Sequence, residues 1–117
     1  MWQRAISGGG GGGSINPDVI YASSIVGDYA QTKTFSVTSG KTYVFTTGIR
    51  GASFTPVLSV TNANVLSHPN KIWTSYRQDG YYDYFETVIF KATNSSITIS
   101  STDLDTSMTG MTLIQLD

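Results

Sequence analysis

The sequence predicts an all-β fold, a single antiparallel β-sandwich of the jelly-roll or immunoglobulin-like type with an extended N-terminal arm. Val, Ile, Thr, Tyr and Phe dominate from Ile15 onward, and turn residues interrupt them about every ten residues. No window sustains the apolar period of a helix. Some seven or eight short strands with turns at this spacing are typical of two packed antiparallel sheets.

The N-terminal arm is defined by an abrupt change in composition. Residues 8–13 are six consecutive glycines, in which no side chain can pack and the backbone has its greatest freedom. We therefore interpret residues 1–14 as an anchor peptide with a hexaglycine linker, and residues 15–117 as the sandwich domain. The length of 117 residues fits one domain of ordinary size.

The peptide before the glycines has the features of a small anchor. Trp2 and Ile6 are four residues apart and share a face if the segment is helical, with Arg4 between them. A flexible linker of six residues spans about 13 Å, so this peptide can reach a neighbouring surface without disturbing the domain. The alternative is a disordered leader or an expression remnant, because seven residues do not fold unaided.

Two strands with clear alternation open the domain. In residues 32–39, Phe35 and Val37 alternate with hydroxyl residues, and in residues 42–47 Tyr43 and Phe45 do the same. A three-residue loop, 38–40, would pair these strands as a hairpin with Phe35 opposite Tyr43. That loop would place Gly40 where a left-handed backbone is needed.

The remaining strands follow from shorter apolar runs between turn residues. Breaks are expected at the Asn, Pro, Gly and Ser clusters of 62–64, 68–70, 78–80, 93–95 and 107–110. An eighth strand, weakened by a small-residue centre, falls in 19–26. The other expected strands are 56–61, 71–76, 81–92, 96–101 and 111–116.

Charge and composition exclude several classes of function. The net charge is −1, so no broad basic field exists to bind nucleic acid. The absence of cysteine excludes disulfides, thiolate zinc sites and cysteine nucleophiles. No apolar run approaches the roughly 20 residues needed to insert in a membrane, and residues 1–14 lack the apolar core of a secretory signal. We expect synthesis in the cytoplasm and no cofactor.

The residues that could perform chemistry are few, and we expect no enzymatic activity. His68 is the single histidine and precedes Pro69 in an expected loop, where it would be solvated. We interpret Asp79, Asp83 and Glu86 as surface acids, because a glycosidase needs two carboxylates in one cleft. Asp103 and Asp105 lie in an oxygen-rich turn that is a weak candidate for calcium.

The stretch 73–85 is the densest in aromatic residues and is the main candidate recognition surface. Aromatic faces and hydrogen-bonding side chains are the groups that bind sugars. Three interpretations stay open for it: contact with a glycan, an interface with another protein subunit, and packing in the core, where we expect Trp73 to be at least half buried. The candidate binding residues are Trp73, Tyr76, Arg77, Asp79, Tyr81, Tyr82, Asp83 and Tyr84.

Three segments resemble small sandwich modules of secreted bacterial proteins and phage tail proteins. They are residues 35–45 (FSVTSGKTYVF), 87–99 (TVIFKATNSSITI) and 111–116 (MTLIQL). Their rhythm is similar to that of pre-peptidase C-terminal-like and carbohydrate-binding modules. A start of Met-Trp-Gln-Arg that leads into polyglycine also resembles short accessory virion proteins of phages that infect Gram-positive or gut bacteria.

The resemblance implies a non-enzymatic phage virion protein of the tail, fibre or baseplate. Its arm would bind other virion proteins, it would be an oligomer in the assembled particle, and host surface glycan is a further contact to be tested. Two alternatives remain. One is a capsid decoration or head-fibre protein that makes only protein contacts, and the other is a small glycan-binding module of a secreted bacterial protein.

Overall fold

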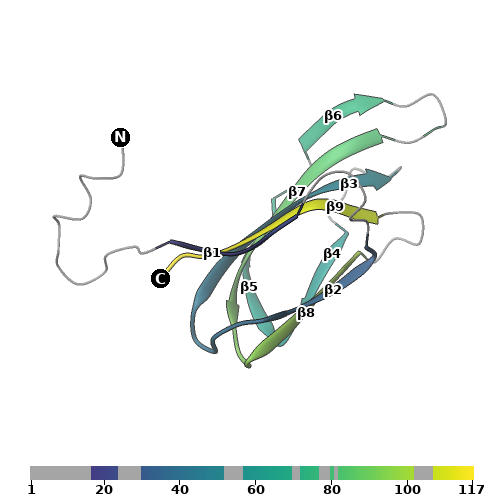
Figure 1. Cartoon of the computed structure of the whole chain (residues 1–117). Helices are drawn as coiled ribbons and strands as arrows, with labels where there is room; N and C mark the ends of the chain where they lie inside the picture. The colour runs from purple at the N-terminus through teal and green to yellow at the C-terminus, as the bar shows by residue number, and fades with distance from the viewer. Residues whose placement is uncertain are drawn as a thin grey trace, which may run out of the picture.

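The computed structural model describes residues 17–23, 30–51, 57–69, 72–76, 80, 82–101 and 107–117, of which 51, 72–76, 82 and 107 are described by their backbone alone. Nine strands form within these residues, in two antiparallel sheets that pack face to face (Figure 1). The expected all-β sandwich is confirmed. The expected anchor, at Trp2, Arg4 and Ile6, lies outside the described residues.

The larger sheet contains six strands. Five of them follow the order β1-β9-β3-β7-β5, and β6 pairs with β7 as well. β5 pairs with the second half of β7 and β6 with the first half, so both lie along the same edge of that long strand. The bounds are β1 (Asp18–Ala22), β3 (Thr42–Gly51), β5 (Ala63–Ser67), β6 (Ile72–Tyr76), β7 (Tyr82–Ala92) and β9 (Ser107–Gln115).

The smaller sheet has the order β2-β8-β4. Its strands are β2 (Thr32–Ser36), β8 (Ser96–Ser101) and β4 (Leu58–Thr61). The chain passes repeatedly between the sheets, since β1, β3, β5 to β7 and β9 belong to one and β2, β4 and β8 to the other. β6 and the adjoining part of β7 lie at one end of the molecule, beyond the small sheet (Figure 1).

The expected hairpin between the first two clear strands is wrong. β2 pairs with β8 in the small sheet, and β3 pairs with β7 and β9 in the large one. Phe35 therefore faces the large sheet across the core, with its ring centroid 5.8 Å from that of Phe45. Alternation alone does not distinguish strands that pair in one sheet from strands that face each other across two. Gly40 does have the expected left-handed backbone, with φ of 89°.

One strand was not expected. Residues 62–64 were interpreted as a break, but only Asn62 lies between β4 and β5, with a φ of 61°. Asparagine tolerates this left-handed conformation better than most residues. The turn therefore takes a single residue, and Ala63 already pairs with Ala92 of β7.

The core lies between the two sheets and follows the alternation of the strands, except in β9, where Met108 and Met111 are three residues apart and both buried. In β3 the inward side chains are Tyr43, Phe45, Thr47 and Ile49, and all four are buried. Buried residues of β7 and β9 and the inward residues of the small sheet complete the core. They are Tyr84, Glu86, Val88, Phe90, Ala92, Met108, Met111, Leu113, Phe35, Leu58, Ile97, Ile99 and Ser101.

Candidate functional site

Two polar side chains face each other inside the sandwich. Thr47 of β3 and Glu86 of β7 are register partners in the large sheet, and both point into the core. On one side of this pair lie Phe45 and Val88, which are also partners and fully buried. We call the set Thr47, His68, Glu86 and Ser101 the polar level of the core.

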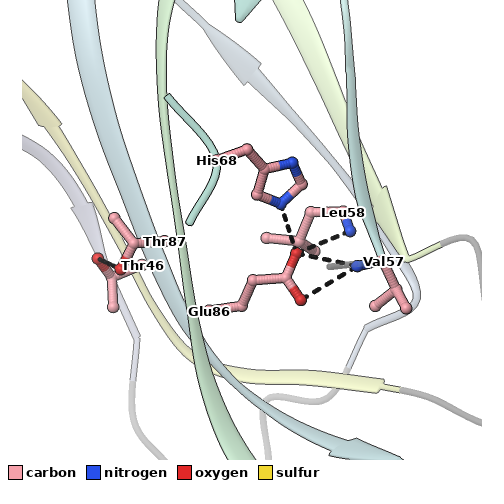
Figure 2. A network of polar contacts seen from close by, with 6 residues as sticks. All are labelled: Thr46, Val57, Leu58, His68, Glu86 and Thr87. Carbon is pink, nitrogen blue, oxygen red and sulfur yellow. Dashed lines mark hydrogen bonds and ion pairs between the residues drawn. The ribbon is translucent and has the colours of Figure 1, made fainter. Parts of the chain in front are cut away.

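The Glu86 carboxylate is held by backbone amides of the opposite sheet (Figure 2). The amide of Leu58 donates to Oε2 at 2.9 Å, and the amide of Val57 lies 3.2 Å from Oε1 and 3.1 Å from Oε2. These amides are at the start of β4, whereas Glu86 belongs to β7. One side chain of the large sheet therefore fixes the beginning of a strand in the small sheet.

His68 provides a third partner for the same carboxylate. Its Nε2 lies 2.6 Å from Oε2 of Glu86. The Glu86 side chain is 0% exposed and the His68 side chain 22%, so the imidazole lies between the carboxylate and the surface. An ionised carboxylate only accepts hydrogen bonds, so in that state Nε2 is the donor.

A β-bulge turns His68 toward the interior. Val65 pairs with Phe90 and Ser67 with Ile89, so Leu66 is an extra residue in β5. In a regular register of the same residues, Leu66 would pair with Ile89 and His68 would fall on the outer face, opposite Thr87. The bulge shifts the register by one residue, so His68 falls on the inner face with Glu86, as expected for a bulge that redirects a side chain.

The other polar-level residues also have partners. The Thr47 hydroxyl lies 3.0 Å from the carbonyl oxygen of Gly48 and 3.1 Å from that of Thr109. Thr109 adjoins a second bulge, in which β9 carries one residue more than β3. Ser101 is buried at 5% exposure and pairs with Leu58, at the strand start that Glu86 holds.

The arrangement of Glu86 indicates a structural role for its charge. Both carboxylate oxygens accept backbone hydrogen bonds, and no part of the side chain reaches solvent. A buried carboxylate is tolerated when its charge is matched by donors, and here two amides and one imidazole supply them. The hydrogen bonds of Glu86 therefore join the large sheet to the small sheet.

The expectations for His68 and Glu86 as solvated groups are therefore wrong. A signal was present in the sequence: Tyr84, Glu86, Val88 and Phe90 alternate along one face of a strand, so Glu86 had to be buried with them. A carboxylate on an apolar face needs a partner. What the sequence could not supply was the bulge that brings the single histidine to it.

The predicted recognition residues divide between the two faces of β7. Asp83 and Phe85 lie on the outer face and Tyr84 on the inner face, as the alternation predicted. Tyr84 is 1% exposed and belongs to the core, so in this structure it offers no surface to a ligand. Phe85, which was not among the candidates, is 49% exposed.

The structure describes the remaining candidates only in part. Trp73 and Tyr76 lie in β6, where their backbone pairs with that of Tyr84 and Tyr82. Nothing further is described for their side chains or for that of Tyr82, so the expected burial of Trp73 stays a prediction. Three candidates fall outside the described residues, namely Arg77, Asp79 and Tyr81.

The outer face of the large sheet is the other notable surface. A row of aliphatic side chains crosses four strands because its members are register partners. The Thr46 and Thr87 hydroxyls, 3.2 Å apart, begin the next row (Figure 2). Arg50 Nε lies 3.4 Å from Asp83 Oδ1 farther along the same face. The aliphatic row consists of Val19, Ile114, Val44 and Ile89.

No cluster of three or more potential metal ligands occurs within the described part of the chain. The weak calcium candidates, Asp103 and Asp105, lie outside it. Among the same described residues, no helix has the length and apolar character required to cross a membrane.

Comparison of the chain with protein-family models, with curated protein sequences and with solved structures found no match.

Proposed function

We propose that the protein is a non-enzymatic structural protein of a bacteriophage particle, in the tail, fibre or baseplate. Its sandwich domain makes contacts with other virion proteins, and residues 1–7 attach it through the hexaglycine linker. The resemblance of residues 35–45, 87–99 and 111–116 to sandwich modules of phage tail proteins supports this assignment.

The observation that carries the proposal is the character of the outer face of the large sheet. Its aliphatic row includes Val19, which is 60% exposed, and Phe85 is also half exposed farther along the face. Between them lie threonine hydroxyls, and the one ion pair described on this face joins Arg50 to Asp83. A weakly charged surface with exposed apolar and aromatic side chains fits a protein contact.

A non-enzymatic role agrees with the use of the groups that could transfer protons. The Glu86 carboxylate is enclosed and committed to the amides of β4, and the Nε2 atom of His68 is committed to Glu86. A general acid or base must reach a substrate proton within hydrogen-bond distance. Of the described aromatic candidates, Tyr84 is buried, which favours a protein contact over a glycan platform on β7.

The direct test is the composition of purified phage particles from the strain that encodes this chain. The protein should be found at a stoichiometric level by mass spectrometry. Deletion of residues 1–13 should abolish incorporation while the melting temperature changes little. Absence of the protein from every particle preparation would refute the proposal.

The outer face can be tested separately with matched variants. Ile89→Lys places a charge in the aliphatic row, whereas Ser59→Lys places one on the exposed face of the small sheet, in β4. Incorporation should fall for the first variant and persist for the second. Binding of the isolated protein to a glycan array would favour a glycan-binding module instead, and release of reducing ends from polysaccharide would indicate an enzyme.

A further inference from the structure

We propose that the outer face of the large sheet binds a second copy of this chain, in a two-fold dimer whose facing sheets have antiparallel strands. The two-fold axis lies between the facing sheets and runs along the row of Thr46 and Thr87. This inference rests on the proposed function only in treating the outer face as a protein contact, and it names the partner.

The outer face is open in the part of the chain that the structure describes. Each of the nine described strands belongs to one of the two sheets, so none of them packs over this face. Val19 is 60% exposed and Phe85 49%, and Val44 and Ile89 are partly exposed. Apolar side chains on a sheet face are suited to packing against another sheet, at a separation of about 10 Å.

The outward residues of β7 form a pattern that is complementary to its own reverse. In chain order they are Asp83, Phe85, Thr87, Ile89 and Lys91. Thr87 is central, an apolar side chain lies on either side of it, and the two ends carry opposite charges. A two-fold axis at Thr87 places Phe85 of each copy over Ile89 of the other. It also places Asp83 over Lys91, and the symmetry of the contact repeats this acid–base pair at the other end.

The neighbouring strand β3 matches this arrangement through the size of its side chains. Thr46 is the register partner of Thr87, and their hydroxyls lie 3.2 Å apart, so the axis crosses both strands at the same row. Val44 lies two residues before Thr46, and Gly48 two residues after it. A Cβ at position 48 would lie 3.3 Å from the carbonyl oxygen of Thr109, which favours glycine there. The axis places Val44 of each copy over this position of the other, where no side chain occupies the space.

The charges favour antiparallel over parallel strands in the facing sheets. With parallel strands, Asp83 would face Asp83 and Lys91 would face Lys91, and like charges that meet in an interface are costly. Asp83 and Arg50 pair at 3.4 Å with both side chains nearly half exposed, and among the described residues no acid pairs with Lys91. In the antiparallel dimer Lys91 joins the exposed pair, and Arg50 faces the uncharged Thr42. A second copy of the chain therefore satisfies the charge pattern of this face.

Sedimentation equilibrium of the full chain, from micromolar to millimolar concentration, tests the dimer. The measured mass should approach twice the 12.6 kDa of the single chain as the concentration rises. Asp83→Lys and Lys91→Asp each place like charges at both ends of the interface, so each should raise the dissociation constant of the dimer about tenfold. The double variant exchanges the two charges and restores opposite pairs. Its dissociation constant should return to near the native value.

Two further variants distinguish the two sheets. Ile89→Lys places a charge between the facing apolar side chains and should abolish the dimer. Ser59→Lys places the same charge on the exposed face of the small sheet and should leave the dimer unchanged. Melting temperatures show which variants remain folded. Should Ile89→Lys fail to fold, the charge variants at the exposed positions 83 and 91 decide the question.

The proposal is overturned if the native chain stays monomeric at every concentration, or if the double charge variant dimerises as weakly as the two single variants. Loss of the dimer in Ser59→Lys overturns it as well, because the contact would then involve the small sheet. A monomeric chain that still enters phage particles overturns this inference alone. A dimeric chain that is absent from every particle preparation supports this inference and refutes the proposed function.

Discussion

The core of this sandwich has two regions that are stabilised in different ways. In the apolar region, Phe35, Phe45 and Phe90 are buried, and the rings of Phe35 and Phe45 pack against each other without a hydrogen bond between them. In the polar level, Glu86 and His68 meet at a defined pair of atoms. The stability of the apolar region depends on the volume it fills and the apolar area it buries. The stability of the polar level depends on whether each polar atom has a hydrogen-bond partner.

The two regions therefore tolerate change differently. Apolar packing is non-directional, so a neighbour can shift and still contribute. A buried carboxylate that loses one donor keeps its desolvation cost. The difference predicts large effects from volume changes in the first region and from single-atom changes in the second.

The largest effect should come from Phe45→Ala. Phe45 is fully buried in the apolar region, and truncation of a buried phenylalanine costs about 3–5 kcal/mol of unfolding free energy. Phe85→Ala is the matched control, because Phe85 is half exposed on the outer face. Denaturant unfolding should show a much smaller loss for the control. Equal losses would mean that the outer face is as tightly packed as the core.

Glu86→Gln should come next. It changes one oxygen to an amide nitrogen with almost no change in volume, so a region that depended only on packing would tolerate it. Whichever position the new NH₂ group takes, it lies beside a backbone N–H that the carboxylate accepted, and the charge that these donors match is lost. We therefore expect a loss of about 3 kcal/mol. Denaturant unfolding at neutral pH measures it. A change below about 0.5 kcal/mol would remove the distinction between the two regions.

His68→Leu sharpens the comparison by removing only the imidazole from the polar level. Glu86 then keeps the amides of Val57 and Leu58 and loses the contact with Nε2. A hydrogen bond to a charged group contributes about 1.5–3 kcal/mol, and we expect denaturant unfolding to show a loss of about 2 kcal/mol. Leu66→Ala is the control and should change stability by about 0.5 kcal/mol at most, because Leu66 is exposed. Equal effects of the two variants would contradict the role of the imidazole.

Asp83→Asn should have the smallest effect. Asp83 lies three residues before Glu86 on the same strand, but its side chain is 44% exposed and its contact with Arg50 measures 3.4 Å. Exposed ion pairs contribute about 0–1 kcal/mol and weaken with salt. Thermal melting at low and high salt should give nearly the same midpoint as the native chain. A larger shift would show that Asp83 holds more than this ion pair.

The apolar region could be predicted from the sequence in some detail. Period-two alternation placed Phe35, Tyr43 and Phe45 on buried faces, and it placed Tyr84 and Phe85 on opposite faces of β7. Which face of a strand is buried depends only on the spacing of apolar residues within that strand. Sheet membership depends on pairing between distant strands, and for this reason the expected hairpin of β2 with β3 was wrong.

For the polar level, the sequence predicts the burial of Glu86 but not its partners. The burial of Glu86 follows from alternation, but its partners come from β4 and from the end of β5. Their approach requires the packing of one sheet on the other and one extra residue at Leu66. Neither is encoded in a local pattern. The recognition role predicted for Trp73, Tyr76 and the neighbouring candidates stays a prediction.

The position of β9 has a consequence for the order in which the chain can fold. β9 lies between β1 and β3, with Ile114 opposite both Val19 and Val44, although it is the last strand in chain order. During synthesis, β1 must wait for a partner that is made almost a hundred residues later. Such distant pairing slows folding, to milliseconds or seconds in small all-β domains. Until β9 leaves the ribosome, the edge of β3 stays open and the nascent chain needs protection from association with its neighbours.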